Sequence, residues 1–189
     1  MIRSIFLRGA LTALLLGVAT GAQANPYTAF QEREVKALSA EEQEGLLQGQ
    51  GMGMALPAEL HGYPGPLHVL EVIDALDLNA EQRQETERMY EEMREEAQAL
   101  GERIVELERE LDEGFASGEI TSERIEALTV EIGELRGRLR HAHLATHLDM
   151  DALLTPEQKA RYEEARGYHD DRDDDEAPHH DHDHGGHHH

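Results

Sequence analysis

Apolar residues recur at alternating steps of three and four positions through the middle of the chain. The first series consists of Tyr90, Met93, Ala97, Leu100, Ile104, Leu107, Leu111 and Phe115. Glu, Arg and Gln occupy most of the positions between them. Because this spacing puts the apolar side chains on one side of an α-helix, residues 80–117 are predicted to form one arm of a coiled-coil-like hairpin.

A second series with the same spacing follows a short turn at Ser117, Gly118 and Glu119. The return helix is predicted to start at Thr121, and its apolar positions are Ile125, Leu128, Ile132, Leu135, Leu139, Ala142, Thr146, Met150 and Leu153. Neither helix can bury its apolar stripe alone, so the two are expected to pack as antiparallel arms. At 1.5 Å per residue, each arm is roughly 45–55 Å long.

Three further positions carry the residue pairs that cap helix starts. These pairs are Ser39 with Glu42, Asn79 with Gln82, and Thr155 with Gln158. They predict one or two short helices within 27–48, the start of the first long arm, and a last helix that ends near Gly167. The fold class is therefore all-α: a long antiparallel helical hairpin with short flanking helices.

The segment before the hairpin is rich in Gly and Pro. Residues 49–66 lack periodicity and are predicted to form a loop, and Pro66 is well placed to start a helix over 67–76. The return arm has a second apolar face at Leu144 and Leu148, off the main stripe. That face needs cover from the 67–76 helix and the residues after it, from the terminal helix, or from a second subunit in a homodimer.

The first 24 residues have the layout of a signal peptide. Arg3 and Arg8 carry positive charge, an apolar run follows over 9–21, and Ala22 and Ala24 are the small residues that a signal peptidase recognises. Cleavage after Ala24 is predicted, with export to an extracytoplasmic compartment. The alternative is a retained N-terminal anchor, for which the run is short against the ~20 residues of a membrane span.

Composition limits the chemistry that the protein can perform. The chain has 40 acidic and 17 basic residues and a formal net charge of −23, which argues against nucleic acid and anionic membrane surfaces as partners. This charge favours cations or basic polypeptides instead. The chain has no Cys, so a metal site must use His, Asp, Glu or Met. No serine has a base beside it and no phosphate-binding loop follows a strand, so the protein is predicted not to be an enzyme.

Two pairs of side chains are candidate metal ligands on predicted helices. His143 and His147 are four residues apart and therefore share one side of a helix, as two ligands of one zinc or copper ion require. His68 and Glu71 are three apart on the predicted 67–76 helix. Either pair alone is also typical of ordinary surface or interface residues. If that short helix packs on the Leu144 side of the hairpin, the four residues form a site of three histidines and one carboxylate.

The C-terminal tail, residues 169–189, contains eight His, seven Asp, one Glu and one Arg. Such a segment cannot bury a core and is predicted to be disordered, which leaves 25–168 as the folded domain. Its candidate ligands for weak binding of Zn, Ni or Cu are His179, His180, His182, His184, His187, His188 and His189. The alternative is an appended purification tag. Met52 and Met54 offer thioethers for Cu(I), or else fill gaps in packing.

Two short motifs resemble a known family. Residues 78–82 (LNAEQ) and 154–158 (LTPEQ) resemble two copies of the LTxxQ motif of the Spy/CpxP superfamily, with Asn79 replacing Thr as an equally good helix cap. The segment AELHGYPGPLHVLEV is most similar to the branch of periplasmic heavy-metal sensors and heavy-metal-resistance proteins. The resemblance covers about residues 27–168. It implies a bent, dimeric, all-helical hairpin with a concave face in the periplasm.

The resemblance also implies functions. Members of the superfamily act as ATP-independent chaperones, or as sensors whose metal sites join a helix carboxylate and His to an HxxxH or HxxxM element. His143 and His147 match that element, and His68 and Glu71 supply the other ligands. Three hypotheses follow: a stress or sensor protein for a divalent transition metal (Zn, Cu, Ni or Co) with a membrane-bound signalling partner, a chaperone of unfolded proteins, and a passive metal buffer acting through the tail.

Overall fold

The computed structural model describes residues 25–168, and within this range every regular element is a helix. The chain divides into two compact units, residues 1–32 and 33–189. The described part of the first unit holds a short 3-10 helix, η1 (Thr28–Phe30). The predicted signal peptide and the predicted tail lie outside the described residues. Among the described helices, none combines the length and the apolar character that a membrane span requires.

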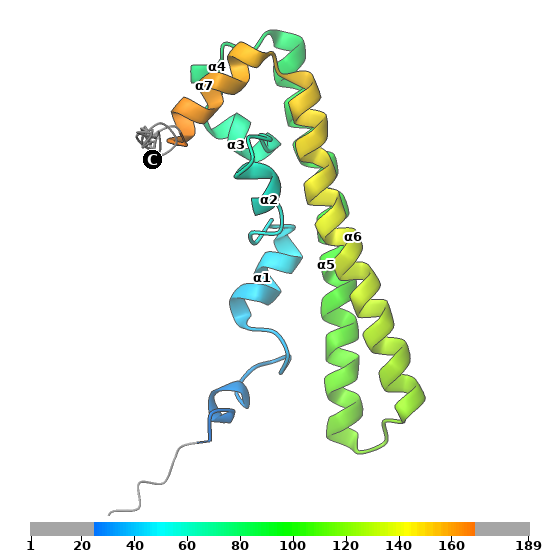
Figure 1. Ribbon diagram of the computed structural model, residues 1–189. Coiled ribbons are helices and arrows are strands. Elements are labelled where there is room, and N and C mark those ends of the chain that lie inside the picture. Colours follow the sequence, from blue (N-terminus) through cyan, green and yellow to red (C-terminus); the bar gives the residue numbers. More distant parts are fainter. Residues whose placement is uncertain (1–24, 169–189) are drawn as a thin grey trace, which may run out of the picture. The chain divides into compact units, whose positions relative to one another are not determined.

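The second unit contains seven α-helices in its described part. They are α1 (Ala40–Gln48), α2 (Leu56–Glu59), α3 (Pro66–Glu71), α4 (Ile73–Leu76), α5 (Ala80–Ser117), α6 (Ser122–Leu153) and α7 (Pro156–Arg166). Helices α5 and α6 pack side by side as the predicted antiparallel hairpin, and α1 to α3 follow one side of it (Figure 1). Helices α4 and α7 pack together at the end opposite the turn.

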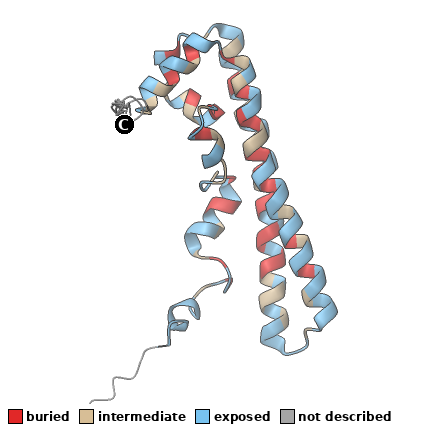
Figure 2. Ribbon diagram, viewed as in Figure 1, coloured by how far each residue is buried: buried red, intermediate tan, exposed pale blue. Residues whose placement is uncertain are grey.

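The predicted apolar stripes form most of the hairpin core. Ile104 and Leu107 on α5 and Leu128 and Leu139 on α6 are almost completely buried. The buried residues lie on the inner sides of the helices, while their outer sides are exposed (Figure 2). Each fully buried leucine contributes roughly 1.5–3 kcal/mol, so the stripe holds the two arms together. The prediction that Phe115 belongs to this stripe is wrong. Its side chain is 60% exposed, because α5 ends two residues later at the turn.

The three predicted capping pairs are confirmed. Each forms a capping box at the start of α1, α5 or α7, with the cap side chain accepting from the backbone N–H three residues on. Gln82 and Gln158, the last residues of the two LTxxQ-like motifs, also bond to each other: Gln82 Nε2 donates to Gln158 Oε1 at 2.8 Å. The return bond, from Gln158 Nε2 to Gln82 Oε1, is 3.0 Å. The two motifs therefore join the start of α5 to the start of α7.

The Gly- and Pro-rich segment before the hairpin is more ordered than its sequence predicts. The predicted loop contains the single-turn helix α2, and the predicted 67–76 helix is broken at Val72 into α3 and α4. Pro66 does start α3, as predicted. Of the three covers considered for the second apolar face of the return arm, the short helices and the terminal helix do not cover Leu148, which stays 61% exposed. Cover by a second subunit stays a prediction.

Candidate metal-binding pocket

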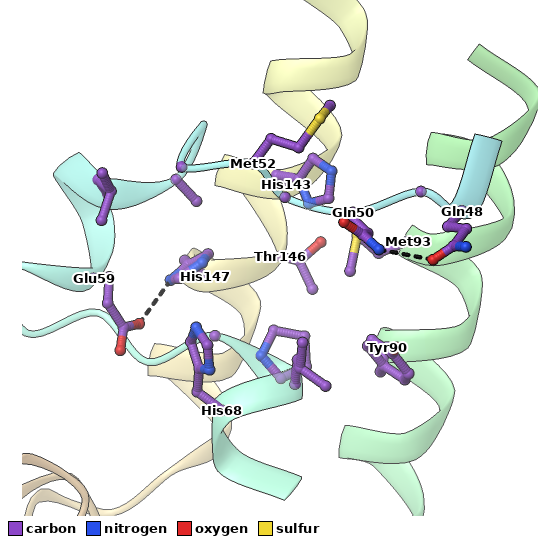
Figure 3. Close-up of a pocket in the computed structure, with 18 residues that line it drawn as sticks. Gln48, Gln50, Met52, Glu59, His68, Tyr90, Met93, His143, Thr146 and His147 are labelled. Atoms are coloured by element: carbon purple, nitrogen blue, oxygen red, sulfur yellow. Dashed lines mark hydrogen bonds and ion pairs between the residues drawn. The ribbon is translucent and has the colours of Figure 1, made fainter. Parts of the chain in front are cut away.

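A cavity of about 450 Å³ lies between the hairpin and the segment that carries α2 and α3. Its walls come from the Gly-rich loop after α1, from α2 and the start of α3, and from the facing sides of α5 and α6 (Figure 3). Three of the predicted ligands line it: His68, His143 and His147. Glu59 of α2 also lines it. The helices therefore bring three imidazoles and one carboxylate to a single cavity.

His147 is buried and held in one orientation. Its Nδ1 lies 2.7 Å from the carbonyl oxygen of Tyr63. Because a carbonyl oxygen only accepts, Nδ1 carries the proton and Nε2 carries the lone pair. The backbone of Gly65 lies against the ring: a Cβ at that position would be 2.8 Å from His147 Cε1. Metal-ligating imidazoles usually donate their other ring N–H to a carbonyl or carboxylate oxygen, as Nδ1–H of His147 does here.

His143 lies one helical turn before His147 and is 6% exposed. Its Nε2 is buried and has no hydrogen-bond partner. Burial lowers the pKa of His143, and the neighbouring imidazole of His147 lowers it further. The ring is therefore neutral near pH 7, which is the state that a metal ligand requires. A buried ring nitrogen without a partner costs free energy, and a ligand bound there would remove that cost.

Glu59 is a buried carboxylate that sequence analysis missed. Its Oε1 accepts hydrogen bonds from the hydroxyl groups of Tyr162 and Tyr168. Burial raises the pKa of Tyr162, and the bond to Glu59 raises it further, so this hydroxyl remains a donor. The other oxygen, Oε2, is buried without a hydrogen-bond partner and lies 3.8 Å from His147 Nδ1. Glu59 thus connects the pocket to α7.

His68 and Glu71 share one side of α3, as predicted, but they have different surroundings. His68 Nδ1 lies 2.9 Å from Glu71 Oε2, and the same oxygen accepts from Arg166 Nη1 at 3.1 Å. Glu71 is not among the residues that line the cavity. Because the carboxylate accepts from Nδ1, the lone pair of His68 is on Nε2. Glu71 orients His68, and Glu59 is the carboxylate inside the pocket.

The pocket brings candidate metal ligands to one cavity, but their side chains do not form a complete coordination sphere. Within residues 25–168, no three His, Asp or Glu side chains lie close enough together to hold one metal ion. The predicted four-residue site therefore stays a prediction. The predicted tail ligands lie outside the described residues. Two methionines were considered above as Cu(I) ligands. Met54 packs against the core cluster that includes Leu46 of α1, whereas Met52 lines the pocket.

The fold and the pocket define a class: a helical hairpin protein with buried imidazoles on the return arm. The chain belongs to the LTXXQ motif family, whose model matches residues 67–166. The match begins in α3, ends in α7 and includes both motifs. The superfamily resemblance drawn from the motifs is thereby confirmed, whereas its heavy-metal branch stays a prediction. No curated protein and no solved structure gives a significant match to the chain.

Proposed function

We propose that the protein is a periplasmic metal-binding stress or sensor protein that holds one divalent transition-metal ion in the pocket around His143 and His147. The observation that carries this proposal is the pair of buried imidazoles on α6, one with an unpartnered Nε2 and one with its Nδ1–H fixed by a backbone carbonyl. Neutral imidazole suits Zn, Cu, Ni and Co. His68 and Glu59 are the further donors that the cavity offers. The predicted signal peptide supports the periplasmic location.

The test is a titration of the chain from residue 25 to 189 with Co²⁺ and Zn²⁺. Visible absorption of Co²⁺ reports the ligand geometry, and competition with a chromogenic chelator gives the Zn²⁺ dissociation constant. We expect the double variant His143→Ala/His147→Ala to lose the tightest site. The matched control is His141→Ala, because this exposed histidine on the same helix is outside the pocket. Equal Zn²⁺ affinity in the double variant and the wild type would contradict the proposal.

A specific surface favours a second candidate function, that of an ATP-independent chaperone. Large apolar side chains are exposed on the segment that covers the pocket: Met52, Leu56, Leu60, Tyr63 and Leu67, each 39–57% exposed. Large apolar side chains exposed on an acidic protein suit transient contact with unfolded proteins. The double variant Leu56→Ser/Leu60→Ser is then expected to suppress client aggregation less well than the wild type, with or without metal. Unchanged suppression by this variant would rule out that surface.

A further inference from the structure

We infer that α7 holds the carboxylates that orient the histidines of the proposed metal site, so that metal binding and the packing of α7 stabilise each other. The inference rests on the proposed function and deepens it, because it names the helix to which the pocket is coupled. The coupling runs through two carboxylates, Glu59 and Glu71. Each of them lies between a histidine of the pocket and a side chain at the C-terminal end of the described chain.

The first connection joins α7 to His147. Glu59 Oε1 accepts hydrogen bonds from the hydroxyl groups of Tyr162 and Tyr168, the second at 2.8 Å. The other oxygen of this carboxylate lies 3.8 Å from His147 Nδ1. Glu59 and His147 are both buried, so water screens the charge of the carboxylate only weakly. A negative charge beside Nδ1 makes His147 a better metal ligand through Nε2, because it offsets the charge of the ion.

The second connection joins α7 to His68. Arg166 Nη1 donates to Glu71 Oε2 at 3.1 Å, and the same oxygen lies 2.9 Å from His68 Nδ1. This pairing fixes the orientation of a ring that lines the cavity. The side chains of His68 and Glu71 are 35% and 48% exposed, so water screens their interaction. We therefore expect this connection to contribute less than the one through Glu59.

The position of α7 is set by its family motif. Gln158, Tyr162 and Arg166 are spaced four residues apart, so they share one side of the helix. Gln158 is bonded to Gln82 at the start of α5, and Tyr162 is completely buried. The glutamine pair that anchors the start of α7 therefore also sets the register in which Tyr162 and Arg166 reach the two carboxylates.

The coupling works in both directions. A buried carboxylate is costly unless hydrogen-bond donors and positive charge surround it. In Glu59, the two tyrosine hydroxyls bond to Oε1, whereas Oε2 has no hydrogen-bond partner. A divalent cation on His147 would supply positive charge on the side of Oε2. If the packing of α7 raises the affinity for the ion, the ion stabilises the packing of α7 by the same factor.

The first experiment measures metal affinity in the chain from residue 25 to 189. The variant Tyr162→Phe/Tyr168→Phe removes both hydroxyl groups and keeps both rings. Tyr168→Phe alone is the milder variant, because this side chain is only partly buried. Tyr27→Phe is the matched control, since Tyr27 is 72% exposed and lies outside the pocket. Chelator competition gives the Zn²⁺ dissociation constant, Co²⁺ absorption reports the ligand geometry, and circular dichroism checks that helicity is retained.

We expect the double tyrosine variant to bind the tightest Zn²⁺ roughly tenfold more weakly than the wild type, at the lower end of the 10–100-fold loss typical of residues that orient metal ligands. The Co²⁺ spectrum is expected to change with it. Tyr168→Phe should show a smaller loss and Tyr27→Phe none. A purely structural role of the two hydroxyls would lower stability but leave the dissociation constant and the Co²⁺ spectrum of the folded protein unchanged, and would overturn the inference.

The second experiment tests the reverse direction by hydrogen–deuterium exchange with and without Zn²⁺. We expect Zn²⁺ to slow amide exchange in α7 of the wild type more than in the half of the hairpin nearest the turn, which reports general stabilisation. This extra slowing is expected to disappear in Tyr162→Phe/Tyr168→Phe. Slowing around His147 without any in α7 would overturn the inference and leave the metal site intact. If no Zn²⁺ site depends on His143 and His147, the proposed function itself fails.

Discussion

The most informative single residue is His143, because its burial makes the folded state sensitive to pH. Burial lowers its pKa below the ordinary value of 6.5. As pH falls below about 6.5, the unfolded chain binds a proton at this histidine while the folded chain does not, so the free energy of unfolding decreases. Once pH falls below the lowered pKa, the folded chain binds the proton too and the decrease from this residue ends.

We therefore expect His143→Leu to be less sensitive to acid than the wild type. Urea unfolding at pH 7.5 and pH 5.5, with a metal chelator present, measures the difference in free energy for each protein. The tail histidines are the same in both proteins, so their contribution cancels in the comparison. His141→Leu is the control because this side chain is exposed. An identical loss of stability in the His143 variant and the wild type would contradict the assignment of a buried neutral imidazole.

Gln158 gives the second prediction at the scale of one residue. Its amide exchanges hydrogen bonds with Gln82 at 2.8 and 3.0 Å, and the side chain is 8% exposed. Gln158→Ala removes both of these hydrogen bonds and the capping bond that the Thr155 N–H donates to Gln158 Oε1, while Gln82 keeps its bonds to the Leu153 carbonyl and the Asn79 N–H. At about 0.5–1.5 kcal/mol per hydrogen bond, the expected loss is roughly 1–3 kcal/mol. The measurement is urea unfolding at pH 7.5. Gln84→Ala on exposed α5 surface is the control, and an equally small loss in both variants would show that the glutamine pair does not stabilise the fold.

The sequence predicts the positions of some site residues but not of others. His143 and His147 are four apart on a strongly periodic helix, so their shared orientation follows from local geometry. Glu59 could not be found in this way. Its burial depends on Tyr162, about a hundred residues later, and α2 is a single turn that no periodic pattern predicts. A carboxylate two residues after Pro57, in a Gly- and Pro-rich segment, has no local signal that separates it from a surface residue.

The packing of α1 on α5 gives a prediction at the scale of elements. At Gly101 the α1 backbone comes so close that a Cβ would lie 2.0 Å from the carbonyl oxygen of Leu46. Gly101→Ala therefore forces the two helices apart, and we expect a loss of roughly 1–3 kcal/mol, as for other overpacked cores. Gly133 is a matched control, because its Cβ position on α6 meets no atom within 4 Å.

Gly133→Ala is expected to stabilise the protein by roughly 0.5–1 kcal/mol, because alanine is the better helix former and nothing obstructs it. Thermal unfolding of the two variants beside the wild type measures both shifts. A lower unfolding midpoint for Gly101→Ala together with a higher one for Gly133→Ala would support the close contact of α1 and α5. If Gly101→Ala were also stabilising, the contact at Leu46 would not hold in solution.

The elements themselves show why some were predicted and others were not. Helices α5 and α6 repeat one apolar spacing over many turns, which no other structure satisfies as well. Helices α2, α3 and α4 are each six residues or fewer. Helices this short are marginal on their own and owe their form to tertiary contacts. The break at Val72 is accordingly absent from the apolar pattern of 67–76, although Pro66 does mark the start.

For the molecule as a whole, the proposed metal binding would be linked to folding. The pocket joins α6 to the segment that carries α2 and α3, so its ligands come together only in the folded chain. A ligand that binds only the folded state stabilises it by RT ln(1 + [L]/Kd), or about 2.7 kcal/mol at a hundredfold excess over Kd. A tail predicted to lack fixed structure offers the same histidines in the unfolded chain. Binding to the tail alone therefore leaves the free energy of unfolding unchanged.

This difference separates a sensor from a passive buffer in one measurement. We expect Zn²⁺ to raise the midpoint of thermal unfolding of the wild type, and a chelator to reverse the rise. His143→Ala/His147→Ala is expected to lose the rise. Any zinc that its tail binds would not restore it, because sites in the tail are shared by the folded and unfolded chains. The control His141→Ala keeps the full shift. A wild-type midpoint that Zn²⁺ does not move, in a protein that binds Zn²⁺, would assign all binding to the tail and leave the pocket without a metal function.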